Sequence, residues 1–247
     1  MTSARRLAAA VLGLATVPVL AGCGGGDGHA SARGAELAAS DLRLTITTDN
    51  GVRLRPTDGD KVGVDRAVAH HWSRHDDTRV LDLSCRDREQ PGRPCPRMPE
   101  IQVPAGTAVT VTARNAGIDA AGLTGPLDLT TVNGDVTVAD SGAGKASLRL
   151  ATRNGSVHTT SVRASALGAR TVNGDVTLDC ATAPRRVSAR TVNGSVDVAV
   201  PHDAPGYRVD ATTDHGRPAV TLPAATDGSA PTMTLATVNG DVRADRL

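Results

Sequence analysis

Hydrophobic and polar positions alternate along most of the chain after residue 41, in short runs separated by turns rich in Gly and Asn. In Leu127-Asp-Leu-Thr-Thr131 and in Val136-Thr-Val138, every second residue is apolar or a threonine. Alternation of this kind predicts β-strands with one buried face, and no helical period of 3.6 residues competes with it in this region. The sequence therefore predicts an all-β protein built from many short strands.

A hexapeptide, Thr-Val-Asn-Gly-Asp-Val, recurs between these runs, with Ser replacing Asp in some copies and a degraded copy at Thr213-Asp-His-Gly216. The recognisable copies begin at Thr131, Thr152, Thr171, Thr191 and Thr237. Most follow one another at about 20 residues, and Asn-Gly is a strong turn signal because both residues tolerate positive φ. We expect structural turns at Asn133-Gly134, Asn154-Gly155, Asn173-Gly174, Asn193-Gly194 and Asn239-Gly240.

Two architectures fit this register. In a β-hairpin meander, the strands on either side of each Asn-Gly turn would pair with each other. In a β-solenoid, the two strands lie in facing sheets and each stacks on its equivalent about 4.8 Å away in the next coil. The steady coil length of about 20 residues, and corners that could stack Asn on Asn in a hydrogen-bonded ladder, favour the β-solenoid.

The remaining folded part, residues 41–103, does not repeat. Leu42–Thr47 and Val52–Leu54 alternate around Asp49-Asn-Gly51 and predict a hairpin. We expect 41–103 to form a strand-rich N-terminal cap on a repeat solenoid of residues 104–247, with 41–247 as one folded unit. Because the last copy ends near Leu247, we expect an open C-terminal edge guarded by Arg243, Asp245 and Arg246.

The first residues predict export and lipidation. Arg5 and Arg6 precede an uncharged apolar stretch, Leu7–Leu20, which is shorter than the roughly 20 residues of a membrane-spanning helix. Its end, Leu-Ala-Gly-Cys23, resembles the bacterial lipobox. We therefore expect residues 1–22 to be a lipoprotein signal peptide, Cys23 to carry a lipid with acyl chains such as palmitate, and 23–40 to be a flexible tether. An ordinary secretory signal containing this cysteine is the alternative.

An exported protein with a lipid on Cys23 is expected on the extracytoplasmic face of the cell membrane. Its lipid would then make the membrane a partner. An oxidising compartment permits disulfides. Cys85 and Cys95 bracket a turn-rich loop and are expected to form one, although sequence alone leaves the connectivity open. Cys180 ends a predicted strand and is expected to point inward as a small hydrophobe.

Composition changes the picture in two ways. The 247 residues include 27 basic and 26 acidic side chains, and the net charge of +1 argues against nucleic acid as a partner. The chain has one Trp, one Tyr and no Phe. Such a chain needs a thin interior that Val, Leu and Thr can fill, and it cannot line a groove with the aromatic rings on which sugars usually stack.

The repeated Thr-x-Asn-Gly-Asp-Val motif, the Cys pair and Val103-Pro-Ala-Gly106 resemble the bacterial family known as "putative adhesins". The resemblance extends over residues 41–247. It implies a β-solenoid at the cell surface or envelope and no established biochemical activity, and the family has no site residues to carry over. Some members are associated with envelope-stress signalling, which makes a signalling role a second expectation by analogy.

Candidate chemistry is sparse. His71, His75 and a neighbouring aspartate, Asp76 or Asp77, could hold a divalent metal, but the same residues also suit a polar hairpin tip, which has no helical face to bring the imidazoles together. The Asp after each Asn-Gly begins the outgoing strand, and Ser156 and Ser195 replace it, so a carboxylate is not required there. No Gly-x-Ser-x-Gly elbow or phosphate loop is present.

We therefore expect no catalytic residue, metal, cofactor or small-molecule substrate. The expected function is that of a membrane-anchored, non-catalytic binding or structural module at the cell surface, with a cell-wall component or an envelope protein as partner. Two alternatives stay open: an envelope-stress signalling partner that binds another envelope protein, and a polysaccharide-active β-helix enzyme.

Overall fold

The structure, a computed structural model, describes residues 42–66, 68–83, 96–225 and 227–247. Every regular element in these ranges is a β-strand, so alternation along the chain is a reliable guide to its local structure. No helix in the described ranges is long and apolar enough to cross a membrane.

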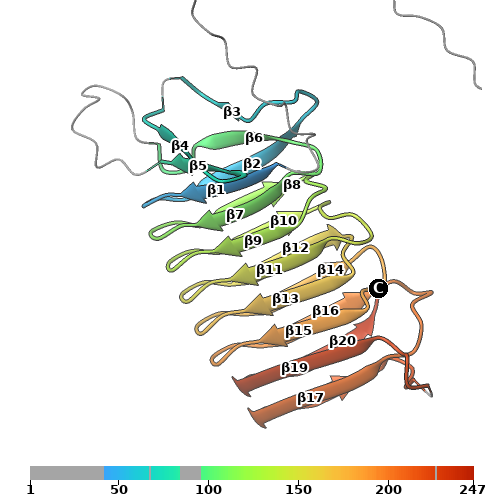
Figure 1. The fold of residues 1–247 in the computed structure, drawn as a ribbon. Coiled ribbons are helices and arrows are strands. Elements are labelled where there is room, and N and C mark those ends of the chain that lie inside the picture. The colour runs from blue at the N-terminus through green and yellow to red at the C-terminus, as the bar shows by residue number, and fades with distance from the viewer. Residues whose placement is uncertain (1–41, 67, 84–95, 226) are drawn as a thin grey trace, which may run out of the picture. The chain divides into compact units, whose positions relative to one another are not determined.

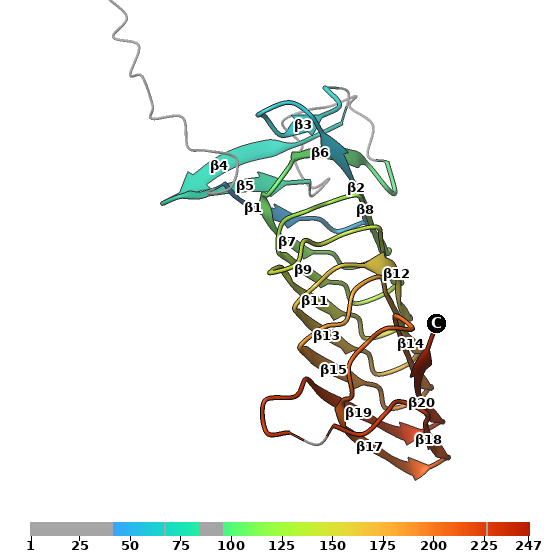
Figure 2. The same ribbon diagram turned by 90° about the vertical axis from the view of Figure 1, so that its right-hand side faces the viewer.

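The strands form two ten-stranded sheets (Figures 1 and 2). Sheet A runs in the order β17 (Arg208–His215), β19 (Thr232–Asn239), β15 (Arg186–Arg190), β13 (Ala166–Arg170), β11 (Ser147–Ala151), β9 (Leu127–Thr130), β7 (Ala108–Thr112), β1 (Arg43–Thr47), β5 (Thr78–Asp82), β4 (His71–His75). Sheet B runs in the order β18 (Pro218–Val220), β20 (Val242–Arg246), β16 (Val196–Val200), β14 (Val176–Cys180), β12 (Val157–Val162), β10 (Val136–Ala139), β8 (Ile118–Ala121), β2 (Val52–Thr57), β6 (Glu100–Pro104), β3 (Gly63–Val64).

Strands that follow each other in the repeat region lie in opposite sheets, and neighbours within each sheet are parallel. For example, β11 of sheet A pairs in parallel with β9 and β13, while β12 of sheet B pairs in parallel with β10 and β14. A hairpin meander would place consecutive strands side by side and antiparallel. The fold is therefore a β-solenoid, and the prediction of its fold class is confirmed.

The core lies between the two sheets and is filled by the alternating apolar residues. Leu148 and Leu150 of β11 and Val157 of β12 are all at most 2% exposed, whereas Arg149 between the two leucines is exposed. Each coil contributes such residues from both arms, so stacking the coils produces one continuous core without any Phe. The one tyrosine, Tyr207, is buried and donates its hydroxyl to the carbonyl oxygen of Pro184 at 2.8 Å.

The expected hairpin at Leu42–Leu54 is wrong. Strand β1 lies in sheet A, where it pairs in parallel with β5 and β7, and β2 lies in sheet B, where it pairs in parallel with β6 and β8. Asn50-Gly51 therefore turns a coil corner like the later Asn-Gly pairs. A hairpin and a coil corner share the same local sequence signal, because both require a tight turn between alternating strands.

The expected C-terminal edge is also wrong. Strands β19 and β20, which hold the last copy of the motif, lie between β15–β16 on one side and β17–β18 on the other. Arg243, Asp245 and Arg246 thus lie on β20, the second strand from the edge of sheet B, and not on the edge strand itself. The last copy keeps the asparagine that extends the preceding ladder, whereas the degraded copy, which lies outermost, has His215 at the equivalent position.

Candidate functional site

The asparagines of the repeated motif form a ladder along the coil corners. Each Asn side chain donates its Nδ2 to the Oδ1 of the asparagine in the coil before it, at 2.9 Å in all four steps. The ladder runs through Asn133, Asn154, Asn173, Asn193 and Asn239. These amides are therefore occupied by one another, which gives them a structural role in joining coils.

The glycine after each of these asparagines is required by both conformation and space. Gly174 has φ of +148°, and a Cβ added to it would stand 2.1 Å from the carbonyl oxygen of Gly155. The equivalent corner glycines, Gly134, Gly155, Gly194 and Gly240, also have positive φ and close backbone neighbours. The corners can approach this closely only because they carry no side chain.

The threonine that begins the motif has a role that the sequence analysis missed. Thr171 is buried, and its hydroxyl donates to the carbonyl oxygen of Gly155 in the preceding coil at 2.8 Å. Thr152, Thr191, Thr213 and Thr237 make the same bond to a corner glycine at the same distance. The constant Thr at the start of each copy was the signal for this interaction, since an inward position in a thin core otherwise favours Val or Leu.

The Asp or Ser after each Asn-Gly accepts a hydrogen bond from a neighbouring coil. Asp175 Oδ1 accepts from the backbone N–H of Ser195 at 2.8 Å, and Ser156 Oγ accepts from the backbone N–H of Asp175 at 3.1 Å. The corner therefore needs an acceptor and not a carboxylate, which explains why the two residue types exchange. These aspartates do not converge on a shared ligand.

The histidine candidates do not form a metal site within the described residues. His71 and His75 lie on β4, where alternate residues share a face, so about 13 Å of strand separates their Cα atoms. No group of three or more His, Cys, Asp or Glu side chains in the described ranges is arranged to hold a metal ion.

Cys23, Cys85 and Cys95 lie outside the described residues. Cys180 is buried as expected, and burial raises the pKa of its thiol to about 12.

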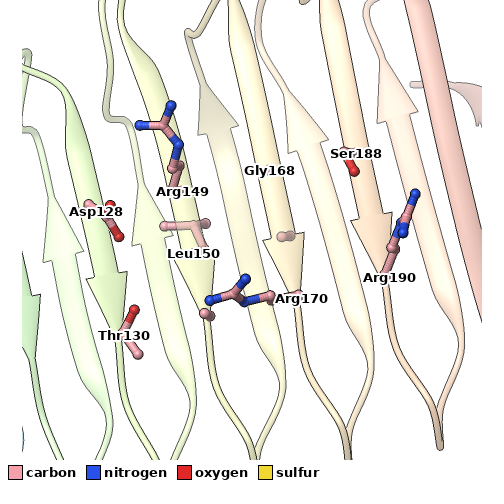
Figure 3. Close-up of a pocket in the computed structure, with 10 residues that line it drawn as sticks. Asp128, Thr130, Arg149, Leu150, Gly168, Arg170, Ser188 and Arg190 are labelled. Atoms are coloured by element: carbon pink, nitrogen blue, oxygen red, sulfur yellow. The ribbon is translucent and has the colours of Figure 1, made fainter.

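A hollow of about 360 Å³ on the outer face of sheet A gathers charged side chains that the sequence analysis did not bring together (Figure 3). Its floor is Gly168 of β13 and its rim carries Arg149, Arg170 and Arg190 from three neighbouring strands, with Asp128 and Ser188 beside them. We call this feature the arginine hollow. Strand pairing creates it, because Gly168 lies between Arg149 and Ser188 in register.

The electrostatics of the arginine hollow are unbalanced. Arg170 and Arg190 occupy the same register position on adjacent strands, an arrangement that is unfavourable for like charges. Within the part of the chain that the structure describes, none of the three arginines has a carboxylate oxygen within 4.0 Å or a hydrogen-bonded side-chain partner. Asp128 is in register beside Arg149 without forming an ion pair.

On the opposite sheet, Arg53 and Arg55 form ion pairs with a carboxylate, that of Asp119. On sheet B, Arg55 donates Nη1 and Nη2 to the two carboxylate oxygens of Asp119, at 3.0 and 3.1 Å, and this hydrogen bonding lowers the pKa of Asp119. The pKa of Asp197 on the same sheet is raised, mainly because it is partly buried. Asp119 thus neutralises Arg55 on sheet B, whereas the arginine hollow leaves three guanidinium groups available.

Alternation along the strands is enough to place Arg170 and Arg190 on the polar, outward side, but it does not show that they are neighbours. Coil lengths vary by a residue or two, so only the observed register shows which outward residues become neighbours. A glycine in an outward strand position, flanked at the coil spacing by arginines, was the available signal.

Comparison with known proteins supplies the family. No curated protein gives a significant match. The chain is similar to a crystal structure titled as a "putative cell adhesion protein" from Clostridium sporogenes ATCC 15579, with a TM-score of 0.35 and 10% identity over 83% of this chain and 92% of that one. A family model described as Toastrack DUF4097 matches residues 105–243, more than half of the sequence. The chain belongs to the Toastrack DUF4097 family.

Proposed function

We propose that this protein is a non-catalytic binding module, lipid-anchored through Cys23 on the extracytoplasmic face of the membrane, and that its arginine hollow binds anionic groups of an envelope polymer. The observation that carries the proposal is the set of three guanidinium groups, Arg149, Arg170 and Arg190, around a floor without a side chain. Guanidinium groups recognise phosphate and carboxylate through paired, charge-assisted hydrogen bonds.

The shape of the arginine hollow also favours a charged group. Small-molecule pockets are usually enclosed and lined by apolar and aromatic side chains. The hollow instead lies on a sheet surface, its rim is polar, and no aromatic residue lines it. Because the arginines come from successive strands about 4.8 Å apart, they suit an anionic chain that runs across the strands.

A non-catalytic role is supported by how the repeated polar groups are used. Asn173 and its equivalents bind one another, and Asp175 and its equivalents accept backbone N–H groups. The arginine hollow holds a single carboxylate, Asp128, and neither a histidine nor a cysteine. General acid–base hydrolysis of a polysaccharide would need a pair of carboxylates facing the substrate.

The binding test uses three probes: polyphosphate, poly-L-glutamate and neutral dextran. We expect the purified protein to bind one or both polyanions and not dextran, with affinity falling as salt rises. Arg170→Ala and Arg190→Ala should each weaken binding about tenfold, since each removes a charge-assisted bond. Arg243→Ala, which removes the same charge from the outer face of sheet B, is the matched control and should have little effect.

Comparison of the two polyanions separates phosphate from carboxylate recognition. If Arg170→Ala, Arg190→Ala and the control Arg243→Ala all lose the same affinity, net charge alone is responsible for binding. That result would refute the arginine hollow as the site. Binding of dextran, or turnover of an envelope polysaccharide, would refute the non-catalytic anion-binding proposal.

The anchor is tested separately by Cys23→Ser. We expect this variant to leave the membrane fraction and to lose the mass of the attached lipid. A Cys23→Ser protein that stays with the membrane, without any difference in lipid mass from the parent, would refute anchoring through this residue.

A further inference from the structure

The ladder of corner asparagines ends at Asn133 on the side of the N-terminal coils. In each of its four steps the Nδ2 of one asparagine donates to the coil before it, so the same geometry aims Asn133 Nδ2 at the coil of Asn115. The backbones of these two coils pair, because Asn133 N donates to Arg114 O at 2.9 Å. No hydrogen bond joins the two asparagine side chains, however, and Asn133 Nδ2 has no acceptor within the described ranges. The first rung of the ladder therefore keeps an unused donor.

Gly117 leaves a second donor unused beside the first. Strands β8 and β10 are neighbours in sheet B, and Ile118 is in register with Val136, so Gly117 takes the position that Asp135 has in the next coil (Figure 1). In later copies the backbone N–H at this position donates to the side chain one coil earlier, as Ser156 N does to Asp135 Oδ1 at 2.7 Å. Gly117 has no side chain to accept from Asp135 N, and this N–H has no other acceptor among the described residues.

Both donors belong to residues that line a hollow of about 420 Å³ at this corner, which we call the corner hollow. Arg97 also lines it and has no carboxylate oxygen within 4.0 Å in the part of the chain that the structure describes, so its guanidinium is available. The corner hollow shares no residue with the arginine hollow. Its other lining residues include Met98, Asn115, Gly117 and Thr137.

We propose that the corner hollow binds the C-terminal end of a peptide, which supplies the acceptors that the coil of Asn115 does not. The terminal carboxylate accepts from Asp135 N–H, as an Asp side chain does in later copies, and it pairs with Arg97. The last peptide carbonyl accepts from Asn133 Nδ2, and the N–H of the same peptide group donates to Asn115 Oδ1. Met98 offers an apolar surface to the last side chain of the peptide. This site is separate from the proposed anion site and does not depend on it.

Other classes of ligand fit these groups less well. A long polyanion is disfavoured, because Asp119 and Asp135 line the corner hollow beside a single unpaired arginine. A neutral glycan would leave Arg97 without a counter-charge and would find no aromatic ring among the lining residues. A free phosphate could accept from Arg97 and from Asp135 N–H, but it has no amide to pair with Asn115 and Asn133. A peptide end combines a carboxylate with an amide one residue away.

The carboxylate is tested with N-acetyl-trialanine and with the same peptide as its C-terminal carboxamide. Isothermal titration calorimetry on the full chain in detergent should show binding of the free acid about tenfold tighter than of the carboxamide. Arg97→Gln should remove most of this preference. Arg114→Gln is the matched control, because it removes the same charge next to Asn115 but outside the corner hollow, and it should keep the preference.

The amide is tested by Asn133→Ala, which should weaken binding of the free acid about fivefold or more. Asn193→Ala is the matched control, because it removes two ladder bonds away from the corner hollow, where Asn133→Ala removes one. It should bind the peptide as the parent does, although it disturbs the ladder more. In the parent labelled with ¹⁵N-asparagine, the peptide should shift the side-chain amide signals of Asn115 and Asn133 more than that of Asn193.

These measurements give clear outcomes. A preference for the free acid that Arg97→Gln removes and Arg114→Gln keeps, with weaker binding in Asn133→Ala alone, supports the proposal. Equal affinity for acid and carboxamide, equal losses in a variant and its control, or no binding at millimolar peptide would overturn it. Displacement of the peptide by inorganic phosphate at the same concentration would assign the site to a free anion and would also overturn it. Arg170→Ala should leave peptide binding unchanged, which separates this result from that for the arginine hollow.

Discussion

Replacing Gly174 by alanine would place a Cβ 2.1 Å from the carbonyl oxygen of Gly155, at a residue whose φ is +148°. Backbone strain in this region costs about 1–3 kcal/mol for a residue other than glycine. Relief of the contact requires the two corners to separate, which weakens the bonds that join them, from Gly155 N to Asn173 O at 2.9 Å and from Asn173 N to Arg153 O at 3.0 Å. At about 1 kcal/mol for each bond, the total loss is about 3 kcal/mol or more.

Gly168→Ala is the matched control, because it makes the same chemical change six residues earlier in the sequence. The φ of Gly168 lies outside the left-handed region, and the nearest atom to an added Cβ, Leu148 O, is 3.9 Å away. We expect this substitution to be neutral or to stabilise the protein by about 0.5 kcal/mol, since alanine restricts the unfolded chain.

Equilibrium unfolding in urea, followed by circular dichroism, would measure both variants against the parent. Hydrogen exchange at β13 and β14 would then locate the change, because cooperativity between coils can break down in repeat proteins. We expect Gly174→Ala to lower the free energy of unfolding and to speed exchange near residue 174. A Gly174→Ala protein as stable as Gly168→Ala would refute the account of close coil stacking.

Three further predictions concern single groups. Thr171→Val should lower the free energy of unfolding by about 1–2 kcal/mol, because it leaves Gly155 O without the 2.8 Å hydroxyl bond. Thr171→Ser should recover part of this loss in the same urea assay. A Thr171→Val protein as stable as the parent would contradict the role of this bond. Because Arg55 lowers the pKa of Asp119, this pair stabilises the fold above the ordinary Asp pKa, and the stabilisation is lost as pH falls through the lowered value. Asp119→Asn should therefore make unfolding less dependent on pH in this acid range, as measured by thermal melts, and an unchanged dependence would contradict the assignment. The Cys180 thiol, with a pKa of about 12, should resist iodoacetamide at pH 8 in the native protein and react after unfolding in urea, so rapid native labelling at Cys180 would contradict its burial.

The strands and corners of the repeat region were predictable because two local signals coincide at each of them. Alternation marks the arms, and Asn-Gly marks the bend, as at Asn173-Gly174 between β13 and β14. The absence of Phe and the steady coil length then favoured stacked coils over a meander. Alternation, turn residues, composition and repeat length can all be read from a single sequence, because each is a local or periodic property.

The order of the coils at the C-terminal end was not predictable in this way. Stacking order depends on which corners fit each other, and the Asn239 amide extends the ladder from Asn193 while His215 is displaced to the outside. The arginine hollow could not be predicted for a related reason. Arg149, Gly168 and Ser188 become neighbours only when the register across three coils is known, and the variation in coil length hides it from the sequence.

The most direct test of the binding proposal is the polyphosphate and poly-L-glutamate affinity of a Gly168→Glu protein. Position 168 has room for a side chain, and a glutamate there would supply the carboxylate that Arg149, Arg170 and Arg190 lack. We predict a variant at least as stable as the parent that has lost its polyanion binding, with Gly168→Ala retaining most of it. A stable Gly168→Glu protein that binds both polyanions as tightly as the parent would contradict the arginine hollow as the binding site.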